Sequence, residues 1–310
     1  MHCTDAGRRR ILTASAAAAL GAALPRVALA ADEPLMTRPI PRSGERLPVV
    51  GIGTAIIFDF ENDPARYAER RDVVRTLVAG GGKLIDTAAA YGHAEERVGD
   101  LVAELGVRDE LFIATKFSYR LDRAAATASM QASLARLRTD RVDLMQAWNV
   151  GEAGYDFGLL RDWQARKLCR YVGMTTSFSA QYGAIAKVLA REKPDFFQVN
   201  YSLGDREAES EVLPAAQDAG AAVIVNLPFG RNSLFRKAAN RPLPDFAAEF
   251  GARTWAQFFL KFILSHPAVT AVIPGTDKPQ YMLDNLAAGR GPLPDAAMRA
   301  RIVRYWDDLR

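Results

Sequence analysis

Residues 83–99, which read KLIDTAAAYGHAEERVG, contain one complete strand–loop–helix unit. The run Lys83–Asp86 is short and mostly apolar, as expected for a buried parallel strand, and it ends in an aspartate. An amphipathic pattern then predicts a helix over Ala94–Leu105. Just before the strand, three consecutive glycines, Gly80–Gly82, end another predicted helix, Ala65–Ala79. The stretch therefore predicts that helices alternate with parallel strands.

The same alternation extends from Leu47 almost to the end of the chain. Each further candidate strand is a short apolar run bounded by turn residues: Val49–Thr54, Leu111–Lys116, Asp143–Ala147, Tyr171–Met174, Phe196–Val199, Ala222–Val225 and Ala271–Ile273. Amphipathic stretches predict more helices, at Arg123–Leu137, Gln181–Arg191, Glu209–Ala219 and Thr254–Ser265. Eight strand–helix units within about 240 residues favour the α/β class and a closed, eight-stranded parallel (β/α) TIM barrel. An open six-stranded sheet is the main alternative.

Three segments fall outside this repeat. Met36–Pro48 has a turn signal at Ser43-Gly44 and is expected to form a hairpin that closes the barrel floor. Leu293–Leu309 is expected to form a final helix. Gly230–Gly251 is the longest segment without a regular pattern, and it follows the seventh strand on the face where barrel active sites lie. A long irregular loop on that face is expected to take part in function.

The composition is that of a soluble globular protein, with 310 residues of which 49% are hydrophobic and 25% charged. A chain of this length can bury a large core without covalent cross-links. Its two cysteines, Cys3 and Cys169, cannot support a disulfide framework, and neither stands at a spacing typical of metal ligands. No metal site is expected.

The first thirty residues have the pattern of a signal peptide. Three arginines, Arg8–Arg10, precede an alanine-rich apolar run, Ile11–Leu24, and Ala28-Leu29-Ala30 forms an A-x-A cleavage site. The run is shorter than the roughly 20 residues that a bilayer requires. We therefore expect residues 1–30 to be a cleaved signal and residues 31–310 to be a single barrel domain; an uncleaved anchor and a disordered tail are the alternatives. The order Gly7-Arg8-Arg9-Arg10 resembles a twin-arginine signal, which implies export of the folded protein to the periplasm by the twin-arginine machinery.

Cleavage after residue 30 would change the charge of the protein. Lys and Arg would fall from 40 to 36 and Asp and Glu from 36 to 35, so the formal net charge would fall from +4 to +1. The basic character therefore belongs mainly to the signal, and it predicts neither a nucleic-acid partner nor a membrane surface. No membrane span is expected after cleavage.

Polar residues stand at the ends of successive predicted strands. Asp86 closes the second strand, Lys116 closes the third, and Tyr91 lies in the loop after Asp86. In a barrel these strand ends converge on one mouth. An ammonium group beside a phenol favours the phenolate, and an aspartate can hold that ammonium in place, so the tyrosine becomes a usable acid or base. Taken singly, each residue also fits an ordinary role in a turn, in solvent or in packing.

Local motifs in the same order resemble the aldo-keto reductase family. They are Val50–Thr54, Ile85–Gly92 followed by Glu95–Gly99, Ala114–Lys116, Val142–Met145, Tyr171–Thr175, and Val272–Thr276 with Asp284-Asn285. The resemblance covers about Leu47 to Leu293. It implies a barrel that transfers hydride, without a metal, between a nicotinamide cofactor and a small carbonyl or alcohol. It also implies Tyr91 as the proton donor, Lys116 as the residue that tunes it and Asp86 as the partner of the lysine.

One residue departs from the family pattern. Trp148 stands where the family usually has a histidine that helps to bind and polarise the substrate carbonyl. An indole has one N–H donor and no basic nitrogen, so it cannot transfer a proton. Losing one such donor typically reduces the rate about a hundred- to a thousandfold. The alternative function is therefore a catalytically attenuated barrel that binds a nucleotide or another ligand.

The resemblance also implies where the cofactor binds. The implied positions are Gly53, Thr54, Asp86, Thr175, Thr176, Gln198, Asn226, Phe229, Gly230, Gly275, Thr276 and Asn285. NADP is the family expectation, but Gly275 and Tyr281 replace the cations that often hold its 2′-phosphate, so NAD is also possible. Arg231, Arg236 and Lys237 could clamp the pyrophosphate, with an ordinary solvated loop as the alternative. His93 lies near Tyr91 and could contact the substrate or be a solvated loop residue, whereas His266 is expected to end a helix.

Overall fold

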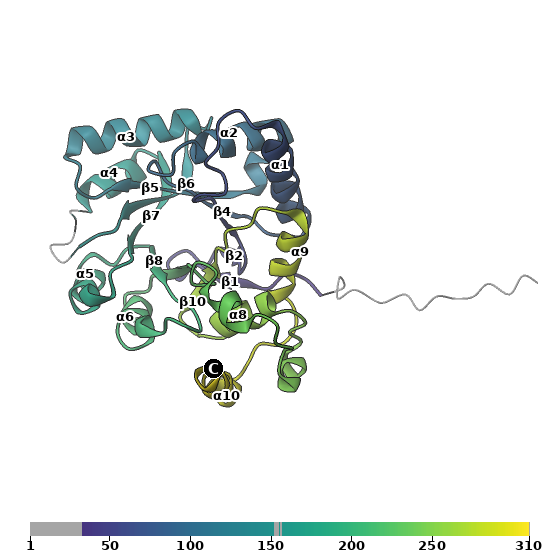
Figure 1. Cartoon of the computed structure of the whole chain (residues 1–310). Helices are drawn as coiled ribbons and strands as arrows, with labels where there is room; N and C mark the ends of the chain where they lie inside the picture. Colours follow the sequence, from purple (N-terminus) through teal and green to yellow (C-terminus); the bar gives the residue numbers. More distant parts are fainter. Residues whose placement is uncertain (1–32, 152–154, 156, 310) are drawn as a thin grey trace, which may run out of the picture. The chain divides into compact units, whose positions relative to one another are not determined.

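The computed structural model describes residues 33–151, 155 and 157–309. The predicted signal, residues 1–30, lies outside this range. The chain divides after Asp32, and the second unit, from Glu33 onward, contains the barrel. Figure 1 shows its helices arranged around the outside of a ring of strands.

Eight parallel strands follow one another around the barrel in chain order. They are β3 (Ile52–Gly53), β4 (Leu84–Asp86), β5 (Phe112–Ser118), β6 (Val142–Trp148), β7 (Cys169–Thr176), β8 (Phe196–Asn200), β9 (Ala222–Asn226) and β10 (Val269–Val272). The bridges Val50–Val272 and Gly53–Gly275 join the first strand to the last. The prediction of a closed eight-stranded barrel is therefore confirmed, and the open six-stranded sheet is excluded.

Helices connect successive strands and cover their outer face, and two more helices follow the last strand (Figure 1). They are α1 (Pro64–Ala79), α2 (Ala94–Leu105), α3 (Arg123–Arg136), α4 (Gly158–Ala165), α5 (Tyr182–Glu192), α6 (Val212–Asp218), α7 (Ser233–Ala238), α8 (Trp255–Leu264), α9 (Pro279–Ala288) and α10 (Ala296–Asp308). Side-chain caps from Asp63, Asp122 and Thr254 begin α1, α3 and α8. The predicted helix Glu209–Ala219 was placed too early, because a separate 3-10 turn, Glu207–Glu209, precedes α6.

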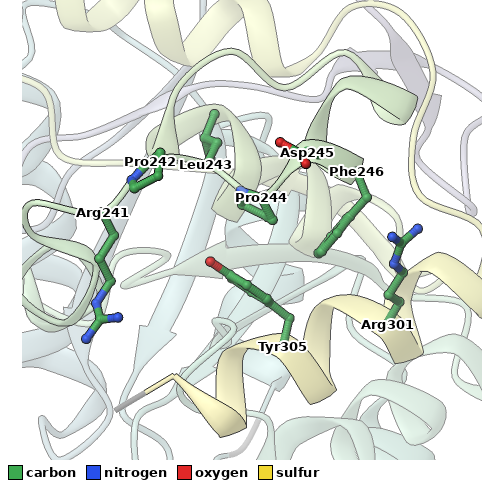
Figure 2. A pocket seen from close by; sticks show the side chains of 8 residues that line it. All are labelled: Arg241, Pro242, Leu243, Pro244, Asp245, Phe246, Arg301 and Tyr305. Carbon is green, nitrogen blue, oxygen red and sulfur yellow. The ribbon is translucent and has the colours of Figure 1, made fainter.

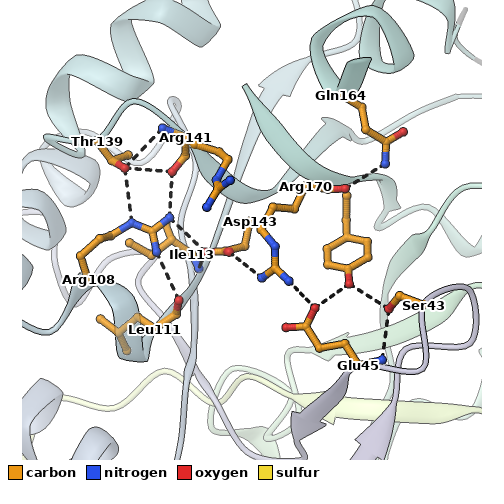
Figure 3. A network of polar contacts seen from close by, with 11 residues as sticks. Ser43, Glu45, Arg108, Leu111, Ile113, Thr139, Arg141, Asp143, Gln164 and Arg170 are labelled. Carbon is orange, nitrogen blue, oxygen red and sulfur yellow. Dashed lines mark hydrogen bonds and ion pairs between the residues drawn. The ribbon is translucent and has the colours of Figure 1, made fainter. Parts of the chain in front are cut away.

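The predicted floor hairpin is present, with β1 (Thr37–Pro39) antiparallel to β2 (Arg46–Pro48). Its apolar side chains Ile40 and Leu47 belong to the same buried cluster as the residues inside the lower barrel. Figure 3 shows one of the polar contacts that fix it, in which Glu45 accepts a hydrogen bond from Arg170. Glu45 also accepts a hydrogen bond from the Tyr171 hydroxyl. The hairpin is therefore held to the floor by both apolar packing and charge.

Asp143 belongs to the same floor network, although it lies in one of the motifs of the family resemblance. Its carboxylate accepts from the Ile113 backbone N–H at 2.8 Å and from Arg170 Nη1 at 2.9 Å (Figure 3). Arg108 Nη2 lies 3.1 Å from the same carboxylate. These contacts join neighbouring strands at their amino ends, opposite the mouth, so the aspartate has a structural role.

The expectation of an irregular loop over Gly230–Gly251 was wrong. The segment contains helix α7 and a six-residue 3-10 helix, Asp245–Phe250. Both are too short to show a helical period, and Pro242 and Pro244 between them read as loop residues. The segment packs against α10, where Phe246 meets Tyr305 with ring centroids 5.5 Å apart.

No helix in the described part of the chain is long and apolar enough to span a membrane. Cys169, in β7, is buried and unpaired with another cysteine, and burial raises the pKa of its thiol to about 12. A thiol in that environment is inert rather than nucleophilic.

Candidate active site

The three residues singled out at the strand ends lie together at the barrel mouth. Asp86 is the last residue of β4, Lys116 lies in β5, and Tyr91 lies in the loop between β4 and α2. Lys116 Nζ donates to Asp86 Oδ1 at 2.5 Å and to the Tyr91 hydroxyl oxygen at 3.4 Å. The two charged side chains are almost completely buried, with 2% of Asp86 and 1% of Lys116 exposed. The predicted grouping of Asp86, Tyr91 and Lys116 is therefore present in the structure.

The ammonium group of Lys116 has an acceptor for each of its three protons. Besides Asp86 and Tyr91, it donates to the Thr87 backbone carbonyl at 2.8 Å. Burial alone would lower the pKa of Lys116, but the charges of Asp86 and Tyr91 and the hydrogen bonds to them outweigh it and raise that pKa above its usual value. Lys116 is therefore a fixed cation at neutral pH, buried beside a phenol.

Tyr91 is half-buried and lies between this cation and Trp148. Lys116 Nζ is 4.9 Å from the centroid of the Tyr91 ring. Trp148, the last residue of β6, meets the same ring edge to face, with centroids 6.4 Å apart and planes at 84°. The indole therefore occupies the place opposite the phenol, as the sequence predicted for the position of the missing histidine.

Two glutamines also donate hydrogen bonds to Asp86. The sequence did not predict that they belong with Asp86, Tyr91 and Lys116. Gln198 Nε2 donates to Asp86 Oδ2 at 2.9 Å, and Gln146 Nε2 donates to the same oxygen at 3.3 Å. Gln198 was expected to bind the cofactor, and its amide nitrogen is occupied by this contact. The signal for Gln146 was its position in β6, two residues before Trp148 and therefore on the same face of the strand.

Three asparagines at the mouth have buried amide oxygens with no hydrogen-bond partner among the described residues. Asn149 follows β6, while Asn200 and Asn226 are register partners at the ends of β8 and β9. An unpaired buried acceptor costs about 1–3 kcal/mol, so these oxygens suit a ligand that brings N–H or O–H donors. A nicotinamide carboxamide and ribose hydroxyls bring such donors. The residues at the mouth therefore fit the group that the resemblance implies.

Thr54, Thr175 and Thr176 lie at the same end of the barrel, as expected for cofactor-binding positions. Thr54 is buried, and both its backbone N–H and its hydroxyl donate to the carbonyl of Asp86, at 3.0 and 3.1 Å. Thr175 Oγ1 accepts from the Asn149 backbone N–H at 2.9 Å. These hydrogen bonds order the loops at the mouth.

The expected positions where the last strand meets the first divide into exposed and internally paired residues. Asn285 in α9 is buried and donates to Thr276 Oγ1 at 2.9 Å, which joins α9 to the end of β10. Gly275 is exposed, and Gly53 approaches the backbone so closely that a Cβ there would lie 3.0 Å from the Ile273 carbonyl. The absence of a side chain at Gly53 therefore allows the two backbone segments to lie close together at this edge of the barrel.

After β9, the two expected residues differ in surroundings. Phe229 packs against Phe235, with centroids 4.8 Å apart, and against Phe259. Gly230 has a positive φ of 54°, a conformation that favours glycine. Phe229 thus anchors the turn into α7 by apolar packing, and Gly230 allows the chain to make that turn.

The basic residues expected near the pyrophosphate are partly engaged elsewhere. Lys237 Nζ donates to the Trp306 carbonyl of α10 at 2.8 Å and lies over its ring. Arg236 Nη1 donates to the Arg231 carbonyl at 3.3 Å. Lys237 therefore ties α7 to α10 instead of forming a clamp.

The two histidines singled out in the sequence have separate surroundings. His93 precedes α2 at the mouth rim, where its backbone N–H donates to Asp59 Oδ1 at 3.0 Å and its Nδ1 lies 3.3 Å from the same oxygen. His266 follows α8, as predicted, and burial together with nearby Arg299 lowers its pKa. His93 therefore joins two mouth loops, whereas His266 belongs to a helix end.

A cavity of 530 Å³ lies outside the site of Asp86, Tyr91 and Lys116, between the segment after α7 and helix α10 (Figure 2). Its lining residues are Arg241, Pro242, Leu243, Pro244, Asp245, Phe246, Arg301 and Tyr305. Arg301 pairs with Glu249 at 3.0 Å and its guanidinium lies over the Phe246 ring. The cavity shares no residue with the Asp86 site.

Within the described ranges, no group of three or more His, Cys, Asp and Glu side chains could hold a metal ion.

Comparisons with known proteins bear on the family and the fold of the chain. The sequence model of the Aldo/keto reductase family matches residues 49–302. An aldo-keto reductase of Mycolicibacterium vanbaalenii is 30% identical over 246 residues, which cover 77% of this chain and 82% of the relative. One of Mycobacterium avium is 30% identical over 247 residues, which cover 78% of this chain and 80% of the relative.

Solved structures share the same barrel. A thermostable aldo-keto reductase in complex with the inhibitor epalrestat is 26% identical, with a TM-score of 0.71 over 89% of this chain and 100% of that one. The aldo/keto reductase of Klebsiella pneumoniae in complex with NADP and acetate is 24% identical, with a TM-score of 0.71 over 85% of this chain and 93% of that one. With the family match covering most of the chain, this protein belongs to the aldo/keto reductase family of NAD(P)-dependent oxidoreductases.

Proposed function

We propose that the protein reduces a small aldehyde or ketone to its alcohol, or catalyses the reverse oxidation, with Tyr91 as the proton donor. The observation that carries the proposal is the buried Lys116, which donates to both Asp86 and the Tyr91 hydroxyl oxygen. A buried ion pair placed against a phenol at the mouth of a barrel has no evident structural task. It suits proton transfer to a carbonyl oxygen.

The residues divide the work in the following way. A bound nicotinamide supplies the hydride that reaches the carbonyl carbon. Because the Tyr91 hydroxyl oxygen accepts a hydrogen bond from Lys116, its own O–H can point toward the mouth and donate to the carbonyl oxygen. The ammonium then stabilises the phenolate that this transfer leaves. Asp86 keeps the ammonium in place and compensates its charge in the buried site.

We expect NADP as the cofactor, with NAD as the alternative. The relative from Klebsiella pneumoniae was solved with NADP, which supports the first choice. Asn149, Asn226 and the two threonines that end β7 are the residues that would hold the nicotinamide end. At the other end, Gly275 and Tyr281 offer no cation for a 2′-phosphate. The preference between the two cofactors is therefore expected to be modest.

The proposal is tested by turnover and binding together. Purified protein is titrated with NADPH and NADH by fluorescence, and oxidation of the cofactor is followed with a panel of aldehydes, ketones and quinones. Tyr91→Phe is expected to reduce turnover about 10²- to 10⁴-fold while cofactor affinity stays within about twofold. Wild-type protein that binds NADPH but reduces no carbonyl in the panel would contradict the proposed reaction.

Trp148 supports a second candidate, a barrel that binds a nucleotide with little chemistry. The indole fills the place opposite Tyr91, so a carbonyl there would lack a second proton donor of the histidine type. This candidate predicts almost no wild-type turnover and a clear gain in Trp148→His. A robust wild-type activity that Tyr91→Phe abolishes would exclude it.

We also propose that the protein is exported in the folded state to the periplasm. The twin arginines within Arg8–Arg10 and the site Ala28-Leu29-Ala30 support this, although both lie outside the described residues. The test fuses residues 1–30 to a reporter that is active only outside the cytoplasm. Replacing Arg8–Arg10 with lysines should block export. Export that continues unchanged would exclude the twin-arginine route.

A further inference from the structure

One layer of side chains inside the barrel is polar, whereas barrel interiors are usually filled with branched apolar residues. Asp86, Gln146 and Gln198 come from β4, β6 and β8, which are alternate strands and therefore contribute to the same layer. The residues two positions earlier on these strands form an apolar layer beneath: Leu84, Leu144 and Phe196. The polarity is thus confined to the layer that borders the mouth.

All three polar members meet at one carboxylate. Asp86 Oδ2 accepts from Gln198 at 2.9 Å and from Gln146 at 3.3 Å, which leaves Oδ1 for Lys116 at 2.5 Å. Both glutamines are buried, with 0% of Gln146 and 2% of Gln198 exposed. Because both amides donate to Oδ2, the carboxylate cannot rotate about the Cβ–Cγ bond of Asp86 without losing both hydrogen bonds. Its other oxygen therefore keeps a fixed direction toward the lysine.

The position of Gln146 is not explained by stability. Its own amide oxygen is buried and has no partner in the part of the chain that the structure describes. Its register partner on β7 is Gly173, where a Cβ would lie 3.1 Å from Gln146 Cγ and 2.9 Å from the Phe196 carbonyl. The glycine leaves room for the glutamine side chain. A leucine would fill that space without burying an unpaired acceptor, so the amide is expected to serve another purpose.

We infer that Gln146, together with Gln198, is a positioning residue that fixes the Asp86 carboxylate and so directs the Lys116 ammonium at the Tyr91 hydroxyl. The inference rests on the proposed function, since it gives the two amides a task in proton delivery. Two ammonium protons are committed to Asp86 Oδ1 and to the Thr87 carbonyl, so only the third reaches the phenol. A carboxylate that turns away would let the ammonium turn with it.

Turnover is the first readout. Gln146→Leu is expected to lower kcat about tenfold or more, while KM for the carbonyl and the Kd for NADPH stay within about twofold. The midpoint of thermal unfolding should change little, because loss of the hydrogen bond to Asp86 is offset by removal of the unpaired amide oxygen. In this readout Gln198→Leu tests the second amide through kcat alone, since Gln198 is also an expected cofactor position and its loss can change the Kd for NADPH. Gln146→Met replaces Gln146→Leu if the latter does not fold.

The second readout needs neither cofactor nor substrate. The side-chain nitrogen of Lys116 is followed by ¹⁵N NMR during a pH titration of the cofactor-free protein, with Lys116→Met to assign the signal. The titratable groups that face it are Asp86 and Tyr91. In the wild type the pKa of the ammonium should lie above the ordinary value for lysine, because burial lowers it less than the charges and hydrogen bonds of Asp86 and Tyr91 raise it. In Gln146→Leu the ammonium should lose its proton at a lower pH than in the wild type. Burial disfavours the charged form, and an Asp86 carboxylate that is no longer fixed opposes this effect less.

Gln257→Leu is the matched control, since Gln257 is also a buried glutamine that donates to an aspartate. Its Nε2 lies 2.7 Å from Asp284 Oδ1 and joins the two helices α8 and α9, without contact to Asp86 or Lys116. This variant should lower stability without moving kcat or the Lys116 titration. The same kcat and the same titration in both Gln146→Leu and Gln198→Leu would overturn the inference, as would a loss of kcat that only follows a loss of stability. Absence of wild-type turnover would instead contradict the proposed function, while the NMR titration would still decide on the positioning.

Discussion

Replacing Lys116 with methionine is expected to destabilise the barrel strongly, because it leaves a buried carboxylate without its cation. Lys116 is 1% exposed and Asp86 is 2% exposed, so water cannot take over the role of the ammonium. Methionine fills a similar volume, and the change is therefore mainly electrostatic. Asp86 keeps the amide donors of Gln146 and Gln198, which carry no net charge.

The magnitude follows from this geometry. Removing one partner of a buried ion pair typically lowers the free energy of unfolding by about 3–5 kcal/mol. In a chain of this size about 1 kcal/mol corresponds to a change of about 2 °C in Tm, so Lys116→Met should lower Tm by roughly 6–10 °C. Adding Asp86→Asn removes the stranded charge, and the amide oxygen can still accept from the glutamines. The double variant should therefore lose only about 1–2 kcal/mol.

The assay is equilibrium unfolding in urea at several pH values, with the exposed Lys187→Met as the control. The control should stay within about 0.5 kcal/mol of the wild type. Because a carboxyl group without a cation can take up a proton instead, the deficit of Lys116→Met should shrink as the pH is lowered. The reasoning is refuted if Lys116→Met loses less than about 1 kcal/mol, or if the single and double variants lose the same amount.

Three further predictions follow from other parts of the structure. Trp148→His should raise kcat toward an unactivated aliphatic ketone, by up to about a hundredfold, because it restores a donor opposite Tyr91; an unchanged or lower kcat would contradict this. Burial lowers the pKa of Lys261 to about 8, whereas lysine in the unfolded chain titrates near about 10.4. Between these values the unfolded chain binds more protons, so stability should rise with pH, and Lys261→Met should remove that part of the rise in urea midpoints measured from about pH 7 to 10. Gly173→Ala should lower the free energy of unfolding by about 1–3 kcal/mol and lower turnover as well, because its Cβ would lie 2.9 Å from the Phe196 carbonyl and 3.1 Å from Gln146 Cγ. The helical Gly183→Ala, whose nearest neighbour is a flexible Glu211 carboxylate, should stay within about 1 kcal/mol of the wild type in the same unfolding assay.

The barrel and its proton-handling trio could be predicted from the sequence because both depend on local patterns. Strands of two to eight residues alternate with helices, and the carboxyl ends of parallel strands meet at one mouth. Asp86 and Tyr91 are separated by one short loop, and Lys116 ends the predicted neighbouring strand. Placing these three side chains together therefore required only the order of the strands.

Other features became visible only in the tertiary structure. The short helix α7 and the 3-10 helix Asp245–Phe250 had no period to detect, and α10 holds this region in place through contacts such as Lys237 to the Trp306 carbonyl. The polar layer is a stronger case: Gln146 and Gln198 reach Asp86 across 60 and 112 residues of sequence. Two-residue periodicity places each side chain on the inner face of its strand. Only closure of the barrel, with its particular register between strands, sets their heights so that both amides meet one carboxylate oxygen.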